Sequence, residues 1–400
     1  MLQVMKIGIG VQGRFHGFEL ANALLTLGHD VHLFTNYPPF VVKRFGLPPE
    51  IVNTHYLQGA LSKITQKMGS FGRSAWINRY LSKSFENWLA RRLGREQWDI
   101  SYTWSSVSER YLRNPRTSKV RLVARGSSHI LTQKRLLEEE EARCGIAQEK
   151  PFDHTVTKEL AEYQLADRVI VLSTFCKNSF LANGYDSGKV GLMVSGSPSD
   201  NFRLTVKEFE QKIQSIEEQS TLNILTVGTF SFRKGMADYS KIVNDLFDKG
   251  VRFRFVGAVA EECSSLTRDL ADKVEFIPRV AQADLKTHYK WGHTFLFPTI
   301  EDGFAMVMAQ ARAACLPQIT TTNCGGYDVV EEGKSGWVFP IRSPELMIEK
   351  IREIQKNRSI VVNMMKEMYR NKVCRTWIDS ANDFLAIAES VNVKLEKKQI

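Results

Sequence analysis

Two adjacent acids, Glu301 and Asp302, follow a short apolar run and stand directly before Gly303. The spacing that follows predicts a helix that begins at Gly303 and carries Met306 and Gln310 on one face, one turn apart. Carboxylates accept hydrogen bonds from hydroxyl groups, and the free N–H groups at a helix start attract phosphate or sugar oxygens. The stretch therefore suits a sugar or phosphate ligand. The alternative is common helix capping by Asp302, but capping does not explain why glycines recur at nearby strand ends.

A second glycine-rich stretch lies near the N-terminus, where residues 8–13 have the spacing G-x-G-x-x-G of a dinucleotide-binding loop. That loop requires a carboxylate at the end of the following strand, to bind the ribose hydroxyls. Here the second strand ends at Asn36, and Asp30 precedes the strand. The pattern therefore does not indicate NAD or FAD. A glycine turn before a helix still lets the backbone approach a polar or anionic ligand, and we expect this of Gly13 and Arg14.

These segments need a scaffold that brings distant strand ends together. Short β-branched runs alternate with helical periods, which indicates an α/β protein with parallel sheets. Residues 195–202 have the composition of a linker between two sheets. Residues 343–395 predict helices only, the last of which could cross back onto the first domain. The predicted strands are Val4–Gly10, Val31–Thr35, Ile100–Thr103, Val120–Ala124, Val169–Leu172, Val190–Val194, Asn223–Val227, Arg252–Val256, Val274–Ile277, Thr294–Phe297 and Gln318–Thr320.

The 400 residues are enough for two domains, each with its own core. No apolar run reaches the roughly 20 residues that span a bilayer, and the first residues do not have the pattern of a signal peptide. The six cysteines are scattered without a C-x-x-C pair. This favours reduced thiols and a cytoplasmic protein, and it argues against a structural zinc site.

The net charge of +10 is unevenly spread along the chain. Residues 40–135 hold 18 Lys and Arg against 5 Asp and Glu, whereas residues 200–372 hold 24 against 23. A basic first half favours an anionic partner such as lipid headgroups, nucleic acid or an acidic glycan. No nucleic-acid recognition motif accompanies the charge, so we expect no nucleic-acid partner.

Residues 61–95 mix these cations with apolar residues, five of which share one helical face: Ile77, Leu81, Phe85, Trp88 and Leu89. Such a face most often packs on the protein core. The cations beside it also suit docking to an anionic membrane. We therefore predict a peripheral association with the inner face of the cell membrane through the basic first domain.

The stretch around Asp302 resembles the donor site of the retaining, nucleotide-sugar-dependent glycosyltransferases of glycosyltransferase family 4. In that family an acid precedes G-F-G and a Glu follows eight positions later; here these positions hold Asp302 and Gln310. The resemblance extends over nearly the whole chain. It implies the α/β GT-B fold, in which two Rossmann-like domains with parallel sheets face a central cleft. The acceptor domain would span residues 1–198 and the donor domain residues 199–373, with a helix at about 374–400 returning to the first domain.

The resemblance also implies roles for single residues. Lys234 matches a lysine that holds the donor diphosphate, and His129 follows a strand where the family often has a histidine close to the reacting sugar. The alternatives are an ordinary surface lysine and a structural histidine at a helix start. The implied catalytic residues are His129, Asp302 and Glu301, and the implied donor-binding residues are Gly13, Arg14, Gly228, Arg233, Lys234, Gly303, Phe304, Ala305 and Gln310.

Three positions depart from the family pattern. Thr229 replaces an arginine, and Gln310 replaces the Glu that binds the ribose hydroxyls of the nucleotide. Asp302 is shorter than the usual Glu, so Glu301 could act in its place. An amide can still hydrogen-bond both ribose hydroxyls, and we expect nucleotide binding to persist.

The resemblance predicts a retaining transfer of a sugar from a nucleoside-diphosphate donor, a UDP- or GDP-sugar, to a hydroxyl of a glycan or lipid-linked acceptor. The expected role is the synthesis of cell-envelope polysaccharide, lipopolysaccharide or glycolipid, without a metal or other cofactor. The leaving phosphate would help to deprotonate the acceptor. The alternative is a non-catalytic sugar-nucleotide-binding protein of the same fold, for which Thr229 and Gln310 are the strongest arguments.

Overall fold

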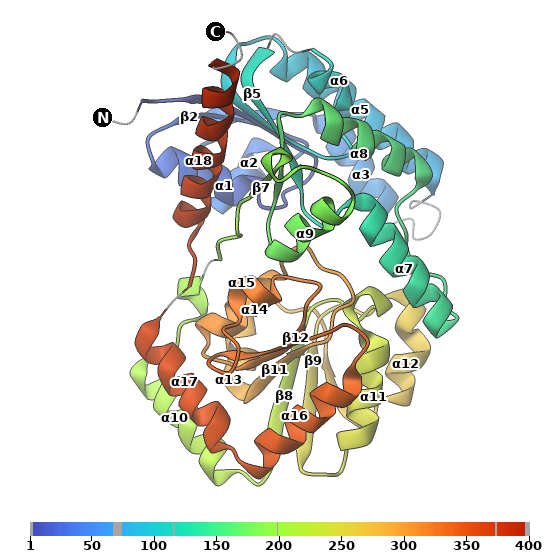
Figure 1. The fold of residues 1–400 in the computed structure, drawn as a ribbon, viewed down its shortest axis with the longest axis vertical. Coiled ribbons are helices and arrows are strands. Elements are labelled where there is room, and N and C mark those ends of the chain that lie inside the picture. The colour runs from blue at the N-terminus through green and yellow to red at the C-terminus, as the bar shows by residue number, and fades with distance from the viewer. Residues whose placement is uncertain (1–2, 67–73, 115–116, 198, 373, 397–400) are drawn as a thin grey trace.

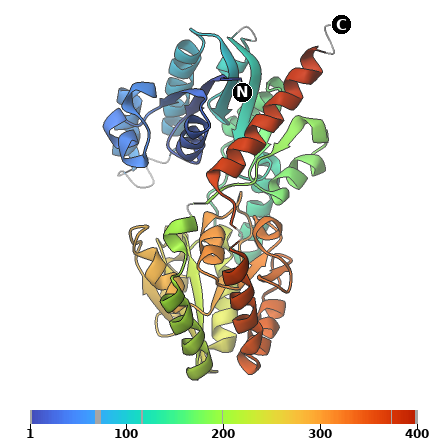
Figure 2. The ribbon, with the colours of Figure 1, turned by 90° about the vertical axis from the view of Figure 1, so that its left-hand side faces the viewer.

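The computed structural model describes residues 3–66, 74–114, 117–197, 199–372 and 374–396. They form two α/β domains, the first at the top of Figure 1 and the second below it. Each domain is built on one parallel sheet, and helices lie on both faces of each sheet (Figures 1 and 2). The predicted fold class is therefore confirmed.

The first sheet has seven parallel strands in the order β3–β2–β1–β4–β5–β6–β7. Its strands are β1 (Lys6–Val11), β2 (Asp30–Thr35), β3 (Val52–Thr54), β4 (Trp98–Trp104), β5 (Ser118–Arg125), β6 (Arg168–Val171) and β7 (Val190–Leu192). The helices of this half are α1 (Gly17–Thr26), α2 (Pro39–Val42), α3 (Tyr56–Gln66), α5 (Ala75–Leu93), α6 (Glu109–Leu112), α7 (Ile130–Cys144), α8 (Asp153–Leu165) and α9 (Thr174–Ala182).

The second sheet has six parallel strands in the order β10–β9–β8–β11–β12–β13. They are β8 (Leu222–Val227), β9 (Val251–Val256), β10 (Val274–Ile277), β11 (Thr294–Phe297), β12 (Gln318–Thr321) and β13 (Gly336–Phe339). The helices are α10 (Val206–Glu218), α11 (Met236–Leu246), α12 (Ser264–Asp269), α13 (Leu285–Trp291), α14 (Met306–Ala313), α15 (Gly326–Val329), α16 (Pro344–Lys356), α17 (Ser359–Asn371) and α18 (Trp377–Glu396).

Each strand predicted from the sequence is present, but two edge strands were missed. β3 has the sequence VNT and is half-buried at all three positions, and β13 has the sequence GWVF and opens on a glycine, a residue that is depleted in strands. Strands that are covered on both faces are apolar throughout, and β8 is buried at all six positions. Such continuous runs are the ones that the sequence reveals.

The glycines within β1 are packing residues. A side-chain carbon at Gly8 would lie 2.6 Å from Leu93, and one at Gly10 would lie 2.7 Å from Leu89. Both leucines belong to α5, so the glycines let this helix pack closely on the strand. The first two glycines of the G-x-G-x-x-G pattern therefore serve helix–strand packing, which agrees with the exclusion of a dinucleotide loop.

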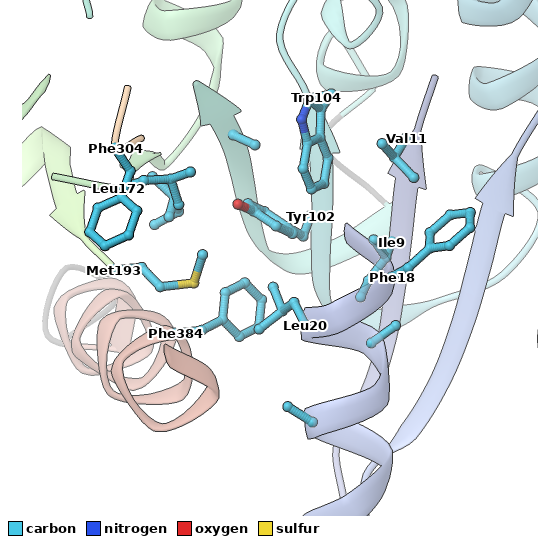
Figure 3. Packing of buried hydrophobic residues seen from close by; sticks show 14 of the residues in the cluster. Ile9, Val11, Phe18, Leu20, Tyr102, Trp104, Leu172, Met193, Phe304 and Phe384 are labelled. Atoms are coloured by element: carbon cyan, nitrogen blue, oxygen red, sulfur yellow. The ribbon is translucent and has the colours of Figure 1, made fainter. Parts of the chain in front are cut away.

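The chain returns to the first domain through α18, which packs against α1, β5 and β7 (Figure 2). Phe384 of this helix contacts the ring of Tyr102 with 5.1 Å between ring centroids. Figure 3 shows Phe384 in the same apolar cluster as Met193, Leu172 and Phe304. Because Phe304 comes from the second domain, one continuous core joins the two domains.

Candidate functional site

A cavity of about 710 Å³ lies between the two domains, and we call it the cleft cavity. Its second-domain wall is formed by the loops after β8, β9 and β10 and by the start of α14. These loops meet at the carboxyl edge of the sheet, next to the point between β8 and β11 where the order in which strands are added changes side. Open parallel sheets bind ligands at such a switch point.

A second cavity of about 910 Å³ opens in the first domain, and we call it the first-domain cavity. Its walls come from α3, α5, the loop after β4 and the start of α8. The two cavities share Arg14, Phe15 and Gly126. Ligands bound in the two cavities would therefore meet at these residues.

Lys234 reaches the cleft cavity from the turn after β8. The turn needs glycine at position 235, where φ is +76° and a side-chain carbon would lie 1.7 Å from the Pro298 carbonyl oxygen. The Lys234 ammonium is hydrogen-bonded to the carboxylate of Asp302. Lys234 and Asp302, which were predicted to have separate roles at the donor site, are thus in direct contact in the cavity.

Asp302 also accepts hydrogen bonds from the N–H groups of Phe304 and Ala305, at 3.2 and 3.0 Å. The capping role that was the alternative interpretation is therefore present together with the contact to Lys234. The predicted helix start at Gly303 was wrong, because α14 begins at Met306. Ala305 precedes it with φ at +65°, a left-handed conformation that is strained for alanine.

Glu301 is completely buried at the contact between the domains and does not line the cleft cavity. Its carboxylate accepts hydrogen bonds from the Ser128 N–H at 3.0 Å, from the Ser127 hydroxyl at 2.9 Å and from the Arg233 Nε at 2.8 Å. Burial alone would raise the pKa of Glu301, but the charge of Arg233 and the hydrogen bonds outweigh it and lower the pKa to about 2. Glu301 is thus held as an anion inside the interface.

Arg233 pairs with Glu301 and lines the first-domain cavity. It does not line the cleft cavity, where Lys234 lies. Gly303 also lies at the interface. A side-chain carbon there would lie 1.9 Å from the Gly126 carbonyl oxygen. Glycine is therefore required for the close approach of the two domains at this point.

Gly228, Phe304, Ala305 and Gln310 line the cleft cavity, as predicted from the sequence. The Gln310 amide oxygen accepts a hydrogen bond from the Tyr289 hydroxyl at 2.9 Å. Arg14 lines both cavities and is ion-paired with Glu19. The turn that precedes Arg14 is held by a hydrogen bond of 2.8 Å from the Gly13 N–H to the Asn36 side-chain oxygen.

His129 lies outside both cavities. It caps α7 by accepting a hydrogen bond from the Leu131 N–H, and its ring packs among Tyr163, Phe180 and Tyr185. Burial and the nearby charge of Arg125 lower the pKa of its imidazole to about 4. The structure thus shows the structural role that was the alternative, and the catalytic role stays a prediction.

Several residues of the cleft cavity were missed by sequence reasoning: Gly257, Ala258, Arg279, Val280, Leu285 and Trp377. Residues 257–258 and 279–285 follow predicted strands, so the rule that ligands bind at carboxyl edges would have found them. Trp377 was not detectable in this way, because it enters the cavity only through the return of α18.

Within the described part of the chain, no group of three or more His, Cys, Asp or Glu is placed to hold a metal ion. The helices described there include none whose length and apolarity would let it cross a membrane. All six cysteines are described, and each is a free thiol.

Residues 221–357 match the family model described as glycosyl transferases group 1. The matched residues lie within the second domain. The capsular polysaccharide biosynthesis glycosyltransferase CapM of Staphylococcus aureus is 24% identical over 205 residues, which are 49% of this chain and 54% of CapM. The putative colanic acid biosynthesis glycosyltransferase WcaL of Salmonella typhimurium is 22% identical over 172 residues, 40% of this chain and 42% of WcaL. The chain thus spans about half the length of these curated relatives.

Solved structures resemble the whole chain. The Anabaena protein HepE, in complex with UDP and glucose, has a TM-score of 0.65 at 12% identity, and the match covers 96% of this chain and 99% of HepE. Sucrose-phosphate synthase from Thermosynechococcus elongatus has a TM-score of 0.61 at 16% identity, and the match covers 99% and 98% of the two chains. These likenesses confirm the GT-B arrangement of the two domains.

Proposed function

We propose that this protein is a retaining glycosyltransferase that moves a sugar from a nucleoside diphosphate to a hydroxyl of a glycan or lipid-linked acceptor. The observation that carries the proposal is the cleft cavity, which is lined by Lys234, Gly228 and the start of α14 and which shares Arg14 and Gly126 with the first-domain cavity. The family match of the second domain supports it. Because CapM and WcaL are named for capsular polysaccharide and colanic acid biosynthesis, we place the reaction in the assembly of envelope polysaccharide, lipopolysaccharide or glycolipid.

The donor is proposed to lie along the second-domain wall. Its diphosphate would contact Gly228, Lys234 and the start of α14, its sugar would lie near Asp302, and its nucleoside would extend past Gln310. UDP- and GDP-sugars are the proposed donors, and the UDP bound to HepE in its structure supports the first. No metal or other cofactor is proposed, so chelation by EDTA should leave the turnover unchanged.

The chain's own groups suit departure of a charged diphosphate. Negative charge gathers on the diphosphate as the glycosidic bond breaks, and the Lys234 ammonium stabilises that charge. The hydrogen bond to Asp302 holds the ammonium in place. The acceptor hydroxyl would arrive from the first-domain cavity, and its proton would pass to the leaving phosphate on the same face of the sugar. Glu301 is sealed in the interface and Asp302 is bound to Lys234, which supports a reaction without a covalent enzyme intermediate.

Donor turnover by the purified full chain tests the proposal. We expect slow release of UDP or GDP from a panel of nucleotide sugars, and Lys234→Ala should lower kcat/KM by about 100-fold through the loss of one charge-stabilising group. Lys249→Ala removes an exposed lysine that pairs with Asp245 and should leave turnover unchanged. Binding without turnover of any donor would favour the non-catalytic alternative, and the absence of binding would reject both.

The proposal includes a cytoplasmic protein that binds peripherally to an anionic membrane. The five apolar positions on one face of α5 are buried or half-buried, so the core-packing alternative holds for them. Other apolar side chains of α3 and α5 are exposed: Leu57, Leu61, Ile64 and Tyr80. Lys63, Arg79 and Lys83 are exposed on the same two helices. We call these seven residues the α3–α5 surface, and its mixed character supports membrane binding.

A further inference from the structure

Gln310 is the polar side chain that α14 presents to the cleft cavity, four residues after the helix begins. At a rise of about 1.5 Å per residue it lies about 6 Å along the helix from the proposed diphosphate site, which is the span of one ribose. Gln310 is 7% exposed, and its side chain is bound to the Tyr289 hydroxyl at 2.9 Å. That hydroxyl has a second acceptor, the Val307 carbonyl oxygen, at 3.2 Å. Whichever way the amide is turned, one of its polar atoms is therefore engaged by Tyr289 and one is left for a ligand.

Among the residues that the structure describes, the same wall offers no free carboxylate to a ribose. Among the described residues that line the cleft cavity, the carboxylates are Asp302 and Glu19. Asp302 is bound to Lys234 and to two backbone N–H groups. Glu19 belongs to α1 of the other domain and is ion-paired with Arg14. A ribose beside Gln310 would thus meet a neutral, half-engaged amide.

The charge of the group at position 310 determines how much binding free energy is lost when the ribose lacks its 2′-hydroxyl. A hydrogen bond from a hydroxyl to a carboxylate is roughly twice as strong as one between neutral groups, and a buried carboxylate that loses its partner is costly. A carboxylate at position 310 would therefore reject a deoxyribose, whereas an amide already bound to Tyr289 loses one neutral hydrogen bond at most.

We infer that this site accepts 2′-deoxynucleoside diphosphates almost as well as ribonucleoside diphosphates, so that its donors include 2′-deoxynucleoside-diphosphate sugars. The inference rests on the proposed function, because it requires the nucleoside of the donor to lie beside Gln310.

Calorimetric titration of the full chain with UDP and with dUDP isolates the 2′-hydroxyl, since the two ligands differ in nothing else. For the wild-type chain we expect the two Kd values to agree within about fivefold, as the loss of a neutral hydrogen bond implies. Gln310→Glu should raise the preference for UDP above about tenfold, because it introduces a charge-assisted partner for the hydroxyl. Gln282→Glu is the matched control: it adds the same charge to the wall of the same cavity and should weaken both ligands alike.

Tyr289→Phe gives a second variant that keeps the charge at position 310 unchanged. It removes the hydroxyl that binds the Gln310 amide, so both polar atoms of the amide become available to a ligand. The preference for UDP should rise by about threefold, which corresponds to one neutral hydrogen bond. A wild-type preference of tenfold or more for UDP over dUDP would overturn the inference while leaving the proposed function intact. If neither nucleotide bound to the wild-type chain, the proposed function would be rejected and the inference with it.

Discussion

The imidazole of His129 caps α7 and packs among three aromatic rings. Its other ring nitrogen is buried without a hydrogen-bond partner. Because burial lowers the pKa from 6.5 to about 4, the unfolded chain binds the proton more tightly than the folded chain. The contribution of the neutral ring to stability is therefore complete above about pH 6.5 and is lost as the pH falls towards 4.

His129→Asn separates the structural role from the catalytic one, because asparagine is an equally good helix cap that does not titrate. We expect donor turnover within about threefold of the wild-type value. The fall in the free energy of unfolding between pH 6.5 and 4, measured by urea titration, should become shallower. A loss of turnover of about 100-fold, the size of a general acid–base contribution, would instead support the catalytic role.

Single residues were predictable where a motif fixes both type and position. Lys234, Asp302 and Gln310 line the cleft cavity because each stands at a strand end or on the helix that follows it. Glu301 and Arg233 have the same local signals, yet they face the domain contact. Which of two adjacent acids enters a cavity depends on the partners that the other domain supplies, and those partners are remote in the sequence.

Among the elements, α3 and α5 combine two different surfaces. Residues Gly59, Ser62 and Lys63 of α3, with Asn78 and Ser82 of α5, line the first-domain cavity. Leu57, Leu61 and Ile64 are spaced by four and three residues, which places them on one exposed stripe of α3. The sequence revealed the cations of this region and favoured core packing for the apolar face of α5, but it did not single out the exposed apolar residues of α3. Burial decides between the two sets, and the helical period alone does not.

The α3–α5 surface should bind vesicles that contain anionic lipid, and the binding should weaken as salt rises. Substituting Leu57, Leu61 and Ile64 together by Ser removes apolar area and should lower the sedimented fraction at least about threefold. Val206→Ser is the matched control, because Val206 is 62% exposed on α10 of the second domain. Equal sedimentation of the wild-type and triple-variant chains would argue against this surface as the site of docking.

At the scale of the whole molecule, the relation of the two domains depends on contacts that span large separations in sequence. Glu301 joins Ser127 and Ser128, and Thr174 of α9 is bonded to Asp328 of α15. Arg342 pairs with Glu139 at 2.8 Å. The alternation of strands and helices predicted two sheets and a returning helix, but it carried no information on this interface. The contacts that shape the cleft were therefore beyond sequence reasoning.

The Glu301–Arg233 pair provides the sharpest test of that interface. Glu301→Ala removes a fully buried carboxylate and leaves the Ser128 N–H and the partly exposed Arg233 guanidinium without their acceptor. A buried polar group left unsatisfied costs about 1–3 kcal/mol. The contact between the domains should therefore open, with a larger radius of gyration by small-angle X-ray scattering and a higher KM for the donor. Arg233→Met together with Glu301→Ala removes the unpaired charge and should recover part of the loss.

Glu139→Ala breaks a partly exposed pair across the same interface. Such pairs are worth about 1 kcal/mol or less, so this control should change neither the radius of gyration nor the KM. If Glu301→Ala left the radius of gyration and the KM at wild-type values, the Glu301–Arg233 pair would have no part in holding the cleft closed.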